Sequence, residues 1–91
     1  MKTGKPLLRL TERVSRVTCD SEAIIELEYF HSRDVLRVTF TSFRVYEFYR
    51  VTEREFRDLR DARSIGSHFN QSLKLTHGFN RLGVSHAQAD A

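Results

Sequence analysis

The chain has 91 residues, of which 40% are hydrophobic, and it carries a net charge of +3 with a sequence isoelectric point near 9.4. This length allows one small domain with a thin core and excludes a second domain. A single cysteine, Cys19, excludes an intramolecular disulfide and any zinc site that needs two or more cysteines. Neither a secretory leader nor a long apolar segment is visible, so the sequence predicts a cytoplasmic protein without a membrane partner.

The first half of the chain predicts an antiparallel sheet. After a loose basic lead-in over residues 1–13, the alternation around Val17 and Cys19 is typical of a short strand. Three clearer strand patterns, joined by short turns, follow at residues 23–30, 35–40 and 44–51, with turn-type residues at 31–34 and 41–43. In the first of these patterns Ile25, Leu27 and Tyr29 are expected to face the core. Such a sheet has an apolar face that another element must cover.

The second half predicts the helices that cover this face. Thr52 is a good N-cap, and Glu55 three residues later completes a capping box. Phe56, Leu59 and Ala62 then form an apolar stripe at helical spacing, and the helix is expected to end near residue 63 or 64. A second short helix is expected to begin at residue 64 or 67, with Ile65, Phe69 and Leu73 available for burial.

The predicted fold class is therefore α+β: an antiparallel meander of three or four strands packed by one capped helix and a second short helix. The predicted domain covers residues 14–74. Residues 75–91 contain two glycines and no clear period, so we expect a flexible C-terminal tail.

Four segments resemble the KTSC domain, a module found at the C-terminus of some lysyl-tRNA synthetases and alone in small bacterial and phage proteins. They are VTCDSEAIIELEY (17–29), LRVTF (36–40), VYEF (45–48) and ARSIGSHFN (62–70). The resemblance covers about residues 14–74 and implies the fold. The family has no established activity, and its association with tRNA synthetases suggests RNA binding.

The sequence departs from the family pattern at three positions. Phe48 stands where the family usually has a second tyrosine, and Thr52 stands near a usual proline. Phe43 occupies a turn position that usually holds glycine. Because a bulky side chain disfavours positive φ, we expect this hairpin to use another turn type, with Phe43 as an exposed contact residue.

Tyr46 and Phe48 allow two interpretations. They could form a base-stacking platform flanked by arginines, as in proteins that bind single strands. The other interpretation, which the small size of the domain favours, is that they are core residues packed under the helix. The candidate nucleic-acid surface comprises Arg37, Arg44, Tyr46, Phe48, Tyr49 and Arg50.

The segment after the first helix is expected to be structural. Gly66 allows a tight turn or close packing, and serines around it cap the backbone. The motif comprises Ala62, Ser64, Gly66, Phe69 and Asn70. An anion pocket is the alternative for this segment.

No catalytic or metal site follows from the spacing of the histidines, so we expect a protein that is not an enzyme and needs no cofactor or metal. The predicted function is a non-catalytic accessory module that contacts RNA or other nucleic acid. The alternative is a small protein-binding adaptor or inhibitor, compatible with a phage origin. It would act through a sheet edge or an aromatic patch around Phe43 and Tyr49, through which it could also form a homodimer.

Overall fold

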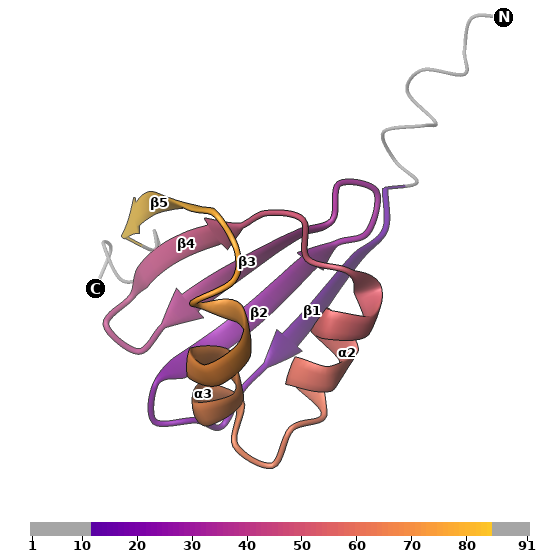
Figure 1. The fold of residues 1–91 in the computed structure, drawn as a ribbon. Helices are drawn as coiled ribbons and strands as arrows, with labels where there is room; N and C mark the ends of the chain where they lie inside the picture. The colour runs from indigo at the N-terminus through magenta and orange to yellow at the C-terminus, as the bar shows by residue number, and fades with distance from the viewer. Residues whose placement is uncertain (1–11, 85–91) are drawn as a thin grey trace, which may run out of the picture.

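The computed structural model describes residues 12–84, which form a five-stranded antiparallel sheet with a helical layer on one face (Figure 1). The strands follow one another in the order β1-β2-β3-β4-β5. The elements are β1 (Val14–Thr18), β2 (Ile24–Phe30), β3 (Val35–Phe40), β4 (Arg44–Phe48), α2 (Glu53–Arg60), α3 (Ile65–His68), the π-helix η1 (Phe69–Leu73) and β5 (Phe79–Val84). The predicted α+β class is confirmed.

The sheet has more strands than the sequence predicts, because β5 lies in the segment expected to be a flexible tail. This part of the prediction was wrong. The segment lacks a convincing alternation of its own, and it becomes a strand by pairing with β4, from Phe48↔Phe79 to Arg44↔Val84. The tail expected at residues 85–91 and most of the lead-in lie outside the described residues.

The inward face of the sheet carries the core that its alternation predicts, with one exception. Leu27 and Tyr29 are fully buried, as expected, but the third inward residue of β2 is Ile24 and not Ile25. A β-bulge explains the difference, because Ile24 pairs with Phe40 while Glu26 pairs with the preceding residue of β3. The extra residue, Ile25, shifts the alternation by one position.

The helices cover the core where the sequence predicts, but α2 ends at Arg60 and not near residue 63 or 64, so Ala62 lies beyond the helix. The capping box at the start of α2 is present: the Glu55 N–H donates to Oγ1 of Thr52 (3.1 Å), and the Thr52 N–H donates to Oε1 of Glu55 (2.9 Å). Phe56 and Leu59 of α2 are buried, as are Phe69 and Leu73 of η1. Among the helices at positions 12–84, none is long and apolar enough to cross a bilayer.

Tyr29 joins the sheet to the start of α2. Its ring stacks on Phe56 with centroids 4.8 Å apart. Its hydroxyl donates to the main-chain carbonyl of Val51 (2.6 Å) and lies 3.0 Å from Oδ1 of Asp34. Burial, together with the neighbouring Asp34 carboxylate, raises the pKa of Tyr29 above its ordinary value of 10, so this hydroxyl stays protonated and able to donate.

We expect Tyr29→Phe to lower the free energy of unfolding by about 1–3 kcal/mol, because it leaves the buried Val51 carbonyl without its donor. Urea denaturation at neutral pH measures the change. Tyr49→Phe is the matched control, since Tyr49 is half-buried and its hydroxyl makes no hydrogen bond within residues 12–84. A loss as large in the control would contradict the special role of Tyr29.

Three residues other than glycine have positive φ: Asp34 (53°), Phe43 (67°) and Arg50 (59°) within the described part of the chain. The expectation that Phe43 would avoid this region was wrong. The Phe43 N–H donates to the Phe40 carbonyl (2.7 Å), so Phe43 occupies the left-handed position that follows a tight turn, where glycine is usual. The ring is half-buried and not fully exposed.

Arg50→Gly tests the cost of the positive φ at position 50. Arg50 is exposed, and its side chain, unlike that of Asp34, is not of the short polar type that tolerates this conformation. A left-handed conformation costs a side-chain-bearing residue about 1–2 kcal/mol, and glycine loses part of this gain through unfolded-state entropy. We therefore expect Arg50→Gly to stabilise the protein by about 0.5–1 kcal/mol. The same substitution at Arg54, inside α2, should destabilise it by about 1 kcal/mol. Thermal unfolding of both variants measures the change in stability. A change of the same sign in both would contradict the backbone strain at Arg50.

Candidate binding site

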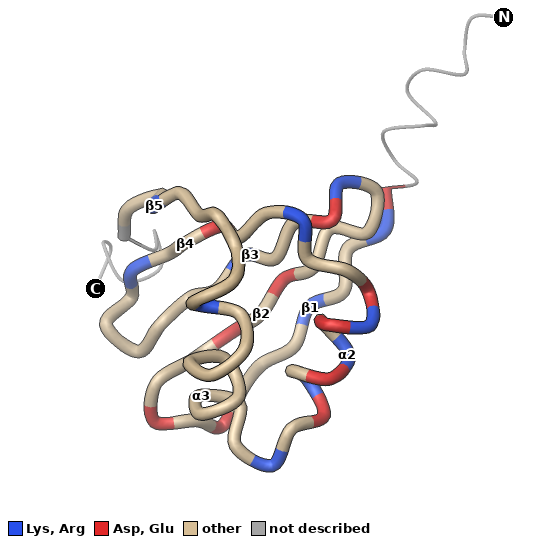
Figure 2. The backbone as a smooth tube through the Cα atoms, viewed as in Figure 1, with Lys and Arg blue, Asp and Glu red and all other residues tan. Residues whose placement is uncertain are grey.

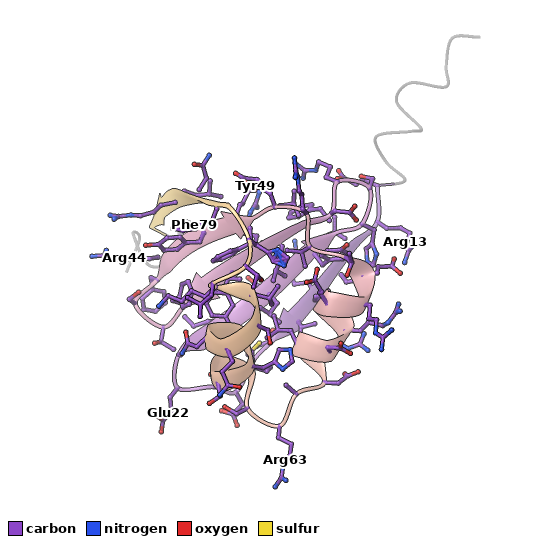
Figure 3. All side chains as sticks on the ribbon, in the orientation of Figure 1. Arg13, Glu22, Arg44, Tyr49, Arg63 and Phe79 are labelled. Atoms are coloured by element: carbon purple, nitrogen blue, oxygen red, sulfur yellow. The ribbon has the colours of Figure 1, made fainter. Side chains whose placement is uncertain are left out.

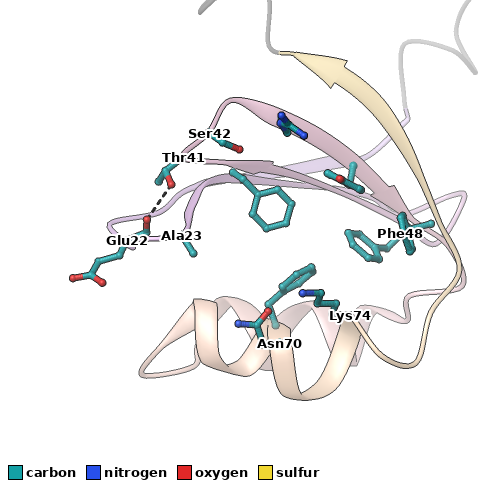
Figure 4. Close-up of a pocket in the computed structure, with 12 residues that line it drawn as sticks. Glu22, Ala23, Thr41, Ser42, Phe48, Asn70 and Lys74 are labelled. Atoms are coloured by element: carbon teal, nitrogen blue, oxygen red, sulfur yellow. Dashed lines mark hydrogen bonds between the residues drawn. The ribbon is translucent and has the colours of Figure 1, made fainter.

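A pocket of about 600 Å³ opens between the sheet and the helical layer, at the end of the sheet where β3 turns into β4 (Figure 4). Five aromatic rings line it, and they come from four elements: β3, β4, η1 and β5. The rings belong to Phe40, Tyr46, Phe48, Phe69 and Phe79. The pocket therefore joins the aromatic pair of the third predicted strand to the predicted structural motif, two segments that the sequence analysis treated separately.

The rings hold one another in place. Phe69 meets Phe40 and Phe48 nearly edge-on, with centroids 5.5 and 5.1 Å away. On the other side, Phe79 lies 5.5 Å from both Tyr46 and Phe48. Such geometries are favourable for aromatic pairs, so the pocket is formed before any ligand arrives.

The exposure of the rings grades from the core to the rim. Phe48 and Phe69 are buried, Phe40 and Tyr46 are half-buried, and Phe79 is 54% exposed. Thus Phe48 is a core residue whose edge contributes to the pocket floor. Tyr46 and Phe79 form the accessible walls, on which a planar ligand could stack.

The π-helix sets the position of Phe69. The Lys74 N–H donates to the Phe69 carbonyl (3.0 Å), five residues earlier, in place of the usual spacing of four. π-Helical turns are rare in proteins, and many of those that occur lie at functional sites. Here the turn buries Phe69 and Leu73 while it brings Asn70 and Lys74 to the pocket (Figure 4).

The rim of the pocket is cationic. Arg44 and Lys74 line it, and Arg81 of β5 pairs across from Tyr46. Within residues 12–84 none of these three cations lies within 4 Å of a carboxylate. Glu22 is the one acid that lines the pocket among residues 12–84, and it directs its carboxylate away from the rings (Figure 4). The pocket therefore combines aromatic walls with uncompensated positive charge.

The opposite face of the sheet is self-neutralised. Arg16 donates to Glu28 (2.6 Å), and Arg37 lies between Glu28 (3.7 Å) and Glu47 (2.8 Å). These are cross-strand neighbours in the pairings of β1 to β4, and Figure 2 shows acids and bases alternating across the strands. The Arg37 guanidinium also lies over the Phe30 ring (4.8 Å). Arg37 is thus turned away from the pocket and engaged in the sheet.

The other residues of the predicted surface lie apart from the pocket. Tyr49 and Arg50 follow β4 at the end opposite to Arg44 (Figure 3), and the Tyr49 N–H donates to the Gly78 carbonyl (3.0 Å). Phe43 lies in the β3–β4 turn and does not line the pocket. Of the six predicted nucleic-acid residues, the structure brings together Arg44, Tyr46 and Phe48.

The predicted structural motif divides between packing and the pocket. Ser64 accepts the Ser67 N–H (3.3 Å) and caps α3. Gly66 packs against Ala23, where an added Cβ would lie 3.5 Å from the alanine methyl group. Phe69 and Asn70 line the pocket, whereas Ala62 does not. Sequence reasoning missed Phe40, Lys74, Phe79 and Arg81. Phe40 is distant in the chain from the other three, Phe79 and Arg81 lie in the segment predicted to be a tail, and the four belong to no common motif.

The fold and the pocket define a class: a small α+β domain whose antiparallel meander is covered on one face, with an aromatic pocket beside the second helical segment. The KTSC domain model matches residues 20–76, so the chain belongs to the KTSC domain family. An uncharacterized protein of Stutzerimonas stutzeri strain A1501 is 33% identical over 64 residues, covering 70% of this chain and 90% of that protein.

The crystal structure of a KTSC domain protein from Yersinia pestis superposes with a TM-score of 0.73 at 22% identity. The match covers 78% of this chain and the whole of that one. It shows that the two proteins share a fold. The resemblance inferred from the sequence is confirmed.

Arg37→Met distinguishes a structural arginine from a ligand-binding one. It should lower the free energy of unfolding by about 1 kcal/mol, since Glu28 and Glu47, whose side chains are only 13% and 14% exposed, lose their shared partner. Arg44→Met, at the pocket rim, should change stability by less than about 0.5 kcal/mol. Guanidinium denaturation is unsuitable because it screens charge, so urea should be used. An equal effect of both substitutions would contradict a structural role for the Arg37 pairs with Glu28 and Glu47.

Proposed function

We propose that this KTSC domain binds single-stranded nucleic acid, with RNA as the first candidate, by taking one unpaired base into the aromatic pocket. The observation that carries the proposal is the combination of half-buried and exposed aromatic rings with unpaired cations on one rim. On the other face of the sheet the arginines and glutamates of neighbouring strands pair with one another, so the positive charges of that face are already neutralised.

The chemistry of a nucleotide matches both parts of the pocket. A base has two apolar faces, and stacking on an aromatic side chain contributes about 1–3 kcal/mol. Tyr46 and Phe79, held 5.5 Å apart and tilted by 49°, offer the accessible rings for this contact. The exposed Asn70 side chain can donate to and accept from the edge of a base.

The three cations would contact phosphate groups that flank the inserted base. Arg44 offers a bidentate fork, whereas Lys74 offers a point charge at the end of η1. Arg81 extends the positive rim along β5. The proposal thus retains Arg44, Tyr46 and Phe48 from the sequence analysis, adds Lys74, Phe79 and Arg81, and leaves out Arg37, Tyr49 and Arg50.

A protein-binding adaptor is the second candidate. The observation in its favour is the apolar edge of the sheet, where Phe79 is 54% and Leu82 49% exposed. An edge strand of this kind can pair with an extended segment of a partner or with a second copy of the chain. This candidate requires binding to a protein with little dependence on salt.

Fluorescence anisotropy with labelled single-stranded RNA, first at about 50 mM and then at about 200 mM salt, tests the proposed function. We expect affinity to fall with salt, because each phosphate contact releases a counterion. An Arg44→Glu/Lys74→Glu variant should bind at least about tenfold more weakly, and its salt slope should be lower by about 1.4, at about 0.7 for each lost contact.

Arg54→Glu/Arg63→Glu is the matched control, because it makes the same change in net charge at exposed positions outside the pocket. The control should retain most of the affinity. Equal losses in both double variants would show non-specific attraction and no pocket. Absence of binding at low salt would contradict the nucleic-acid role and leave the adaptor, which sedimentation of the wild type against Phe79→Ser/Leu82→Ser then tests for self-association through β5.

A further inference from the structure

A second cluster, far from the pocket along the sheet, brings together a serine, a histidine and a glutamate. The Ser15 hydroxyl of β1 lies 2.7 Å from Nε2 of His31, in the β2–β3 turn. The other ring nitrogen of His31, Nδ1, lies 2.6 Å from Oε2 of Glu53, the first residue of α2. The order of contacts is that of a nucleophile, its general base and the carboxylate that orients the base.

The imidazole ring of His31 is held in one orientation. It meets the Tyr29 ring edge-on, with centroids 4.8 Å apart, and its side chain is only 11% exposed. A carboxylate only accepts hydrogen bonds, so Nδ1 must carry the proton that is directed at Glu53. Neutral His31 therefore presents the lone pair of Nε2 to the Ser15 hydroxyl, which is the tautomer that a general base requires.

Glu53 is kept ionised by its surroundings. The hydrogen bond from His31 lowers the pKa of this carboxyl below its ordinary value. Arg13 (3.5 Å) and Arg57 (3.2 Å) add positive charge beside its two oxygens. An ionised carboxylate at this position stabilises the imidazolium that forms when His31 accepts a proton.

We propose that Ser15 is a nucleophile activated by His31 and Glu53, and that it hydrolyses small acyl esters. This activity goes beyond the proposed binding role and uses none of its residues. It also differs from the sequence-based expectation of a non-catalytic module. That expectation rested on the spacing of the histidines along the chain, which could not show that residues 15, 31 and 53 meet in space.

The reaction balances with water as the only co-reactant. Ser15 Oγ attacks the ester carbonyl carbon while its proton passes to Nε2 of His31. The bond to the leaving alcohol then breaks, and His31 returns the proton to the alcohol oxygen, which leaves acyl-Ser15. A water molecule attacks the acyl carbon and gives a proton to His31, and Ser15 recovers its proton as the carboxylic acid departs.

The position of Ser15 on an open edge provides access and a donor for the developing oxyanion. β1 ends the sheet on its side, among the described strands, and Ser15 is half-buried. The odd-numbered residues of β1 bond to β2. This follows from two hydrogen bonds, from the His31 N–H to the Arg13 carbonyl and from the Cys19 N–H to the Ile25 carbonyl. By alternation, the Arg16 N–H points away from β2, next to Ser15. A shallow edge site of this kind suits a small acyl group.

Labelling with an alkyl fluorophosphonate tests the nucleophile directly. The Ser15 Oγ–P bond forms, the P–F bond breaks, fluoride leaves and His31 takes the hydroxyl proton. In the wild-type full chain, peptide mass spectrometry should find the adduct on Ser15, formed at least about 100-fold faster than on Ser32 or Ser42, since a positioned base contributes at least about that factor. Both reference serines are exposed turn residues.

His31→Gln should abolish the preference for Ser15, whereas His77→Gln should not. His77 is the matched control, because its Nε2 also meets a carboxylate, Oε2 of Glu55 at 3.0 Å, but no serine hydroxyl bonds to its ring within residues 12–84. Circular dichroism verifies that each variant is folded. Wild-type protein should also release more than one equivalent of nitrophenol from p-nitrophenyl acetate, and Ser15→Ala should release none above background.

Three results would overturn the proposal. They are a wild-type Ser15 that reacts no faster than Ser32 and Ser42, undiminished labelling in folded His31→Gln, and nitrophenol release that stops at one equivalent. The first result needs no variant, so it decides even if His31→Gln fails to fold. If any of the three results is found, Ser15, His31 and Glu53 form only a hydrogen-bond network that connects β1 to α2. RNA binding is read out independently, because Arg44 and Lys74 are not involved in the cluster.

Discussion

The arrangement of the sheet and α2 depends on the hydrogen bonds of the Tyr29 hydroxyl group. It donates to the Val51 carbonyl in the connection between β4 and α2, and it lies close to Asp34 in the β2–β3 turn. The same ring stacks on Phe56 and meets His31 edge-on. One buried side chain thereby sets the position of α2 over the sheet, and with it the distance between His31 and Glu53.

The two faces of the sheet divide charge and apolar surface. On the face turned away from the helices, arginines and glutamates form cross-strand pairs, which neutralise one another and stabilise the sheet. The other face is apolar, but a layer made of α2, α3 and η1 is too short to cover all five strands. Near the β3–β4 turn, where Phe40 and Tyr46 are only half-buried, the cover is incomplete, and this part of the face forms the aromatic pocket together with η1 and β5. The pocket is therefore a consequence of a thin helical layer on a broad sheet, with Arg44 and Lys74 at its mouth because a rim faces solvent.

Much of the fold could be predicted, because local patterns and the fold agree over most of the chain. The Thr52–Glu55 capping box, the Phe56 and Leu59 stripe and the three central strand patterns need only neighbours within four residues. Predictions failed where a distant segment overrides local preference. β5 forms because β4 offers a free edge, and Ile24 replaces Ile25 in the core because of a bulge against β3. Phe43 adopts a positive φ because the hairpin closes around it.

The sequence by itself determined the class of the fold, the family, the capped helix and the presence of an aromatic pair beside arginines on one strand. Only the tertiary structure decided which of those arginines meet the aromatic pair: Arg44 shares their face, whereas Arg37 is paired with Glu47 on the other. It likewise decided that Phe40, Phe69 and Phe79 complete one pocket and that Ser15, His31 and Glu53 meet. The physical reason is that helical and strand periods are local properties of a chain. A binding or reactive site depends instead on strand register and on helix placement, which are set by contacts between residues far apart in the sequence.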